Sequence, residues 1–313
     1  MQPKQKHWME KVYVQTACVV AMAAAYFGLW HLVRLWDPSG PMVFLASGQG
    51  GNLVTVAGLM LGIGLAAALV TLPARPEAAM LVTLSGLAGV AFRSGPMRVL
   101  LWDYRDYYAA PFKAFAPMAA ETLLLGLLLA ALAVEVMLIR RLAERIVPKW
   151  VFREEITLTT QGSDKSKSAD KQASSPWYLS ALAVVLLEGA ASAVLLAIML
   201  RSPERGQVAF ALIAAFALSA MLIYQFFPMK MSLPFWLAPV LVAVAVYILG
   251  SMTHAYPEGP RWYHALMMAQ DKPIRAALPL DWIALGGGGA LLGYWVARRA
   301  QYGRLVEAAE TEA

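Results

Sequence analysis

The stretch WYLSALAVVLLEGAASAVLLAIML, residues 177–200, contains one charged residue, Glu188, among apolar, small and hydroxyl-bearing side chains. A hydrocarbon core about 30 Å thick is crossed by a helix of roughly 20 such residues. The stretch therefore predicts a transmembrane helix. Glu188 falls near its middle, about 12 residues from either end.

Seven further segments have a similar character. The chain is 59% hydrophobic and 15% charged, with a mean hydropathy of +0.56, which excludes a soluble globule and a disordered chain. Cys18 is the only cysteine, so a disulfide scaffold is excluded as well. We predict an all-α polytopic membrane protein with eight transmembrane helices, at residues 13–33, 53–72, 78–92, 117–139, 177–200, 208–227, 235–252 and 282–297.

The distribution of Lys and Arg predicts the orientation of these spans, because basic residues favour the cytoplasmic side. With the N-terminus inside, the cytoplasmic segments hold 16 basic residues and the outer loops hold 10. We therefore expect both termini in the cytoplasm and the protein in the plasma membrane, specifically a bacterial inner membrane. A basic cytoplasmic rim beside anionic lipids accounts for the net charge of +6, so no nucleic-acid partner is expected.

The second half of the sequence resembles the first. The outer loops GPMRVLLWDYRDYYAAPFKAFAP, residues 95–117, and GPRWYHALMMAQDKPIRAALP, residues 259–279, both open with Gly-Pro. Both close on the pattern P-x-[KR]-A-x-x-P and lead into a span that ends in two arginines. YVQTACVV from Tyr13 likewise resembles YLSALAVV from Tyr178, in the same order along the chain. This ordered similarity predicts an internal duplication.

The duplication predicts two four-helix repeats, residues 1–160 and 177–313, joined by a flexible cytoplasmic linker at 161–176. Four spans per repeat give both copies the same orientation, so a pseudo-twofold axis along the membrane normal should relate them. We expect a functional site on that axis.

The two outer loops are expected to form short interfacial helices on the outer leaflet. Their aromatic and charged side chains could bind a sugar or a lipid headgroup, or they could simply form the aromatic belt found at membrane interfaces. The residues that would bind such a ligand are Trp102, Asp103, Arg105, Asp106 and Trp262.

Two glutamates are candidates for contact with a substrate or for proton coupling. An ionisable group as deep as Glu188 is costly and marks a functional hypothesis. The alternative is a structural one, in which a protonated Glu188 bonds a main-chain carbonyl or Ser192 one turn away. Glu121 opens the fourth span on the outer side, where it could line a vestibule or interact with the helix dipole.

Other motifs are weaker. The run Gly286 to Gly289 permits either a close approach between helices or a break in the eighth span. The histidines and Cys18 do not show the spacing of a metal or haem site, and no nucleophile elbow is present. We therefore expect no metal and no cofactor, and we assign no catalytic residue.

The leading functional hypothesis is a transporter or channel-like protein that moves a small solute, an ion or a lipid at the interface of the two repeats. One alternative is a non-catalytic membrane subunit or scaffold, with a membrane-protein partner or a second copy of the chain. Another is a membrane enzyme that acts on a lipid-linked substrate at the outer leaflet through Asp103 and Asp106. Of these three hypotheses, enzymatic activity is the least favoured. The bilayer is the one partner that all three share.

Overall fold

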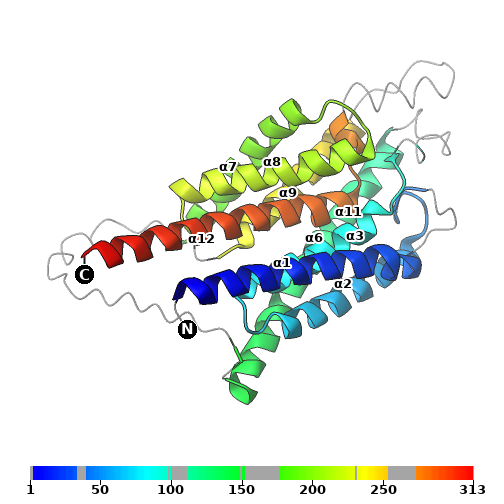
Figure 1. Ribbon diagram of the computed structural model, residues 1–313. Coiled ribbons are helices and arrows are strands. Elements are labelled where there is room, and N and C mark those ends of the chain that lie inside the picture. Colours follow the sequence, from blue (N-terminus) through cyan, green and yellow to red (C-terminus); the bar gives the residue numbers. More distant parts are fainter. Residues whose placement is uncertain are drawn as a thin grey trace.

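The computed structural model is a bundle of helices (Figure 1). It describes residues 3–33, 40–97, 99, 111–148, 150–151, 177–229, 231–252 and 273–312, and no β-strand occurs among them. Most of the residues predicted to form the interfacial helices of the outer loops, and the whole linker at 161–176, lie outside these ranges. We call residues 1–160 the N-terminal half and residues 177–313 the C-terminal half.

A helix covers each of the eight predicted segments. The N-terminal half contains α1 (Pro3–Phe27), the short 3-10 helix η1 (Leu29–Leu32), α2 (Gly50–Val70), α3 (Pro76–Phe92) and α6 (Pro111–Ile146). The C-terminal half contains α7 (Trp177–Met199), α8 (Arg205–Phe226), α9 (Leu233–Ser251), η3 (Pro273–Ala276), α11 (Pro279–Asp281), η4 (Trp282–Gly286) and α12 (Gly287–Glu312).

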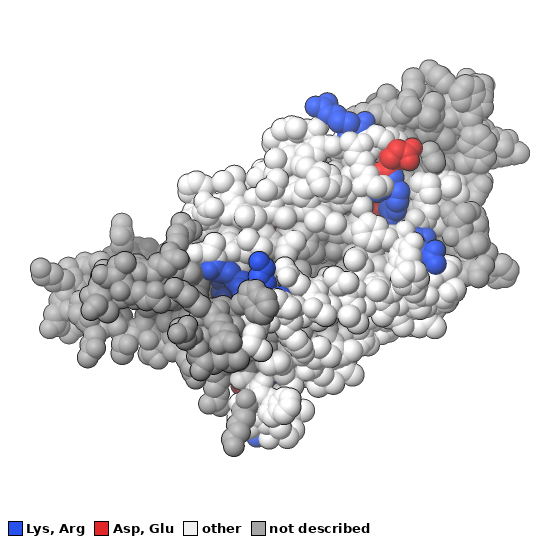
Figure 2. All heavy atoms as spheres, in the orientation of Figure 1, with Lys and Arg blue, Asp and Glu red and all other residues white. Residues whose placement is uncertain are grey.

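Five of these helices, α2, α6, α7, α8 and α9, are long and apolar enough to cross a membrane. Helix α3 is apolar but has only 17 residues, and α1 and α12 each combine an apolar part with a charged part. On the face drawn in Figure 2, the charged side chains lie toward the two ends of the bundle and the middle is uncharged. The protein is therefore an integral membrane protein.

Both chain termini lie at one end of the bundle, which we call the termini end; the opposite end is the loop end (Figure 1). Helix α3, almost all of whose side chains are buried, packs against α1, α2, α6 and α12. Helix α9 packs against α6, α7 and α12. The extensive contacts of α6 with α9 and of α12 with α3 join the two halves into one bundle.

Some helix ends differ from the predicted ones. Helix α1 ends at Phe27, and the 3-10 helix η1 follows within the predicted span. Helix α6 begins at Pro111 and continues through Pro117, where we expected it to start. The fixed φ of Pro111 suits a first helical turn, and membrane helices tolerate an internal proline such as Pro117.

The glycine run of the last span does not interrupt the helix. A π-helical turn, η4, ends at Gly286, and α12 continues without a break from Gly287. A Cβ atom at Gly289 would lie 2.5 Å from the main-chain oxygen of Ile213, and one at Gly293 would lie 2.2 Å from that of Ala217. The glycines therefore allow α12 to approach the backbone of α8 closely.

Candidate functional site

Glu188 lies on the buried stripe of α7, which also contains Val184, Ser192 and Leu196. Its side chain is fully buried, and neither carboxylate oxygen has a hydrogen-bond partner within the described part of the chain. Ser192 donates its hydroxyl hydrogen to the main-chain oxygen of Gly189 at 3.0 Å. The bond between Glu188 and Ser192 that we considered is therefore not formed.

Glu121 is also fully buried, near the loop end of α6. Its Oε2 accepts hydrogen bonds from the main-chain N–H groups of Phe44 at 2.8 Å and Leu45 at 2.9 Å. Its Oε1 has no partner among the described residues. Glu121 thus fixes the segment that precedes α2 against α6.

The loop end of the C-terminal half contains a buried ion pair that we did not predict. Arg205, the first residue of α8, binds both carboxylate oxygens of the fully buried Asp281. Asp281 also accepts the N–H of Leu278 at 2.9 Å, and Arg205 donates to the main-chain oxygen of Ala91 at 2.5 Å. The pair therefore joins α8 and α11 to the end of α3. The sequence did contain a signal for this pair, because Arg205 and Asp281 carry opposite charges at the ends of two predicted spans.

The proposed outer-surface ligand residues are not placed by the structure. Trp102, Asp103, Arg105, Asp106 and Trp262 all lie outside the described residues. Their role in binding a headgroup stays a prediction.

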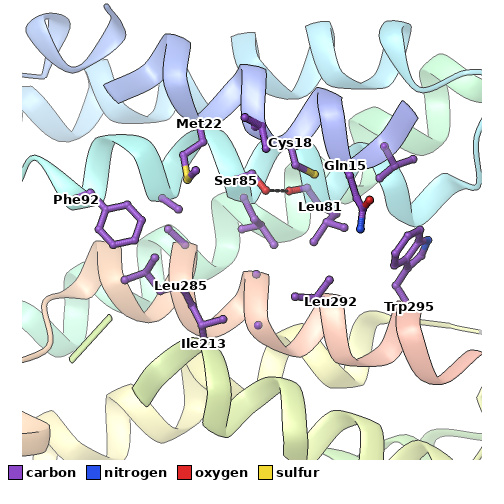
Figure 3. A pocket seen from close by; sticks show the side chains of 17 residues that line it. Gln15, Cys18, Met22, Leu81, Ser85, Phe92, Ile213, Leu285, Leu292 and Trp295 are labelled. Atoms are coloured by element: carbon purple, nitrogen blue, oxygen red, sulfur yellow. Dashed lines mark hydrogen bonds between the residues drawn. The ribbon is translucent and has the colours of Figure 1, made fainter. Parts of the chain in front are cut away.

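A cavity of about 530 Å³ lies between the two halves, and we call it the inter-half cavity. Its walls come from α1 and α3 of the N-terminal half and from α8, η4 and α12 of the C-terminal half (Figure 3). Glu188 and Glu121 do not line it. The side chains labelled around it in Figure 3 are those of Gln15, Cys18, Met22, Leu81, Ser85, Phe92, Ile213, Leu285, Leu292 and Trp295.

The lining of the inter-half cavity is mainly apolar. Gln15, Cys18 and Ser85 are its polar exceptions, and Ser85 already donates its hydroxyl hydrogen to the main-chain oxygen of Leu81 at 2.8 Å. Gln15 and Trp295 lie at one end of the cavity, whereas Met22 and Phe92 lie at the other (Figure 3). Of the polar side chains, Gln15 lies toward the termini end, and Cys18 and Ser85 lie near the middle of the cavity (Figure 3).

Arginine–aromatic contacts flank the cavity at both ends. At the loop end, the guanidinium of Arg93 lies over the rings of Tyr26 and Trp30, at 4.5 and 4.6 Å from their centres. At the termini end, Arg299 lies 4.5 Å from the centre of the Trp295 ring and 3.5 Å from a carboxylate oxygen of Glu10. These contacts attach α1 to α3 at one end and to α12 at the other.

A second group of charged residues lies at the termini end. One of its contacts joins the two halves, and the others hold the N-terminal half together. Arg298 of α12 forms an ion pair with Glu77 at the start of α3. Arg140 of α6 is buried and donates to the main-chain oxygens of Thr71 at 3.4 Å and Ala74 at 2.7 Å. These bonds fix the loop between α2 and α3 at the end of the bundle.

Comparison of the chain with protein-family models, with curated proteins and with solved structures gives no match. The chemistry of the site must therefore be inferred from this chain alone.

Proposed function

We propose that this integral membrane protein binds a lipid-like molecule in the inter-half cavity and moves it along the interface between two related four-helix halves. The observation that carries the proposal is the cavity itself, because residues of both halves line it and its surface is mainly apolar. Of the solutes considered from the sequence, a small solute, an ion or a lipid, a lipid-like molecule best fits this lining.

The apolar walls argue against an ion or a hydrophilic solute. Ions cross proteins along rings of carbonyl oxygens or charged side chains that replace their hydration shell. The inter-half cavity offers Gln15, Cys18 and Ser85 instead, among aliphatic and aromatic side chains. An acyl or prenyl chain would bury apolar surface there, with its polar end near Gln15 and Trp295.

One contact between the halves is consistent with the proposed duplication. In the predicted correspondence, α3 matches α9 and α6 matches α12, so the contact of α6 with α9 is equivalent to that of α12 with α3. Glu121 and Asp281 add a second parallel. Each carboxylate lies toward the loop end of the last long helix of its half; Glu121 binds the segment that precedes α2, and Asp281 binds the first residue of α8.

The proposal includes eight transmembrane spans and places both termini in the cytoplasm. Helices α1, α3 and α12 would complete the eight, and the arginines at the termini end would face anionic lipids of the inner leaflet of a bacterial inner membrane. Glu188 does not line the inter-half cavity. The proposal therefore assigns contact with the transported molecule to the cavity and not to Glu188.

A lipid-movement assay tests this function. The protein is reconstituted into vesicles that contain a fluorescent phospholipid, and dithionite is added to bleach the outer leaflet. We expect wild-type protein to make inner-leaflet lipid accessible to the reductant. Gly288→Leu should remove most of this rate, because Gly288 lines the cavity and its added side chain would extend into it.

Ala190→Leu is the matched control. Ala190 is an exposed residue of α7 outside the inter-half cavity, so the same side chain added there should leave the rate unchanged. The proposal is wrong if wild-type vesicles bleach like protein-free vesicles. It is also wrong if Gly288→Leu and Ala190→Leu behave alike.

A further inference from the structure

A second cavity of about 410 Å³ lies at the termini end, where the start of α3, the last turns of α6 and the start of α9 meet. We call it the termini-end groove. Its floor is apolar, and its rim carries four charged side chains, those of Glu77, Arg140, Arg141 and Glu144. The apolar lining residues include Met80, Val136, Met137, Leu233 and Trp236.

The four charges of the rim itself sum to zero, two arginines against two glutamates, but one of the glutamates is already paired with a residue outside the groove. Glu77 forms its ion pair with Arg298, which lies outside the groove. Counting that partner, three arginines stand against two glutamates, which leaves a net charge of +1. An amphiphile with a single negative charge would complement this rim.

Arg140 is already held in place for such a ligand. Its side chain is 6% exposed, and main-chain oxygens of Thr71 and Ala74 fix two of its guanidinium nitrogens. Both acceptors are neutral carbonyls, so only the nearby glutamates offset its positive charge. Because guanidinium carries five N–H donors, capacity for an anionic oxygen remains. Arg141, the next residue, is exposed at the mouth of the groove.

The apolar floor fits the remainder of an amphiphile. Trp236 lies near the start of α9, and its side chain is 2% exposed where it lines the groove. Met80 and Val136 continue the apolar surface from the rim toward the middle of the bundle. Basic pockets between transmembrane helices are a known mode of recognition for phospholipid headgroups.

We propose that the termini-end groove is a binding site for a glycerophospholipid of the adjacent leaflet. Its phosphate would bind Arg140 and Arg141, and one acyl chain would lie along Met80, Val136 and Trp236. The site is separate from the inter-half cavity, and it does not depend on lipid movement through that cavity.

Lipid binding to the purified full-length protein tests the site, with native mass spectrometry as the readout. Three probes separate the parts of the ligand: phosphatidylglycerol, the matched diacylglycerol without phosphate, and glycerol phosphate without acyl chains. We expect phosphatidylglycerol alone to bind tightly. Arg141→Gln should weaken its binding about fivefold, the effect of one basic residue near a membrane surface.

Arg145→Gln is the matched control, because Arg145 is an exposed residue of the last turn of α6 that does not line the groove. It should leave binding unchanged, as should Gly288→Leu in the inter-half cavity. Equal binding of diacylglycerol would overturn the role of the phosphate, and binding of glycerol phosphate alone would overturn the role of the groove. Equal losses in Arg141→Gln and Arg145→Gln would show a general basic surface instead of a site.

Discussion

At the scale of single residues, the main question is why Glu188 is buried without a partner. An unpaired polar group inside a protein costs free energy, and an isolated charge costs far more, so we expect Glu188 to carry a proton. Its two oxygens still lack hydrogen-bond partners in the described part of the chain. Glu188 therefore destabilises the fold locally. A function of this residue would explain why it is present.

Glu188→Leu should raise the free energy of unfolding by about 1–3 kcal/mol, because it replaces an unsatisfied polar group with an apolar one of similar size. Glu188→Gln keeps a polar head at the same place and should give little or no gain. Thermal unfolding of both variants in detergent measures the difference. A lower midpoint for Glu188→Leu would show that Glu188 makes a favourable interaction that stabilises the fold.

Asp281 presents the opposite case, a buried carboxylate with a charged partner. Asp281→Asn should destabilise the protein by about 3–5 kcal/mol, because it leaves Arg205 partly buried without its counter-charge. Replacing both residues, Asp281→Leu with Arg205→Met, should recover part of that loss. Denaturation midpoints of the single and double variants give the comparison. Equal loss in the single and double variants would show that the unpaired charge of Arg205 is not the cause of the destabilisation.

At the scale of elements, the contact of α12 with α8 depends on which face of α12 the glycines occupy. Gly289 faces the backbone of Ile213 at a distance that excludes a side chain, whereas a Cβ atom at Gly288 would meet Leu84 at an ordinary 3.7 Å. Adjacent glycines therefore have different roles. Both line the inter-half cavity, but only Gly289 stands at the close contact between α12 and α8.

Alanine substitutions at these two glycines test that difference. Gly289→Ala should lower the thermal midpoint clearly, because α12 and α8 must separate. Gly288→Ala should be neutral or stabilise the helix by up to about 1 kcal/mol, the gain in helix propensity. The two variants have the same composition, so each serves as a control for the other. Similar midpoints would contradict the assigned faces.

The helices themselves were largely predictable, because an uncharged run of about 20 residues has few alternatives to a membrane helix. Their ends were less so. The start of α6 at Pro111 lies in a stretch of mixed polarity where apolar length gives no boundary. The end of α1 at Phe27 could not be predicted, because the apolar run continues through η1.

At the scale of the whole molecule, the candidate site could not be predicted from the sequence. Helices that are apolar on all sides give no periodic signal of which face meets a neighbour. The sequence identified Glu188 by its unusual chemistry, but the inter-half cavity consists of ordinary residues such as Leu84 and Ala88 that only the fold brings together. Arg205 and Asp281 are 76 positions apart for the same reason.

The two cavities suggest how the molecule is organised. The inter-half cavity lies beside α1 and α12, and the termini-end groove lies where α3, α6 and α9 meet. Helix α3 contributes to both and is the most extensively buried of the long helices described. We therefore expect α3 to be the rigid centre around which the other helices pack.

The central claim, that the inter-half cavity admits lipid chains, is tested most directly at Cys18. It lines the cavity and is the only cysteine of the chain, so a nitroxide can be attached without any mutation. Collisions of the nitroxide with oxygen report a lipid-filled environment, and collisions with a water-soluble nickel complex report water.

In reconstituted vesicles, we predict that oxygen relaxes the nitroxide at Cys18 far more than the nickel complex does. Gly288→Leu should lower its accessibility to oxygen. A reference label at Val20, which is 60% exposed on α1, should not change with that substitution. Dominant collisions with the nickel complex at Cys18 would mean a water-filled cavity and would contradict the proposed lipid-like ligand.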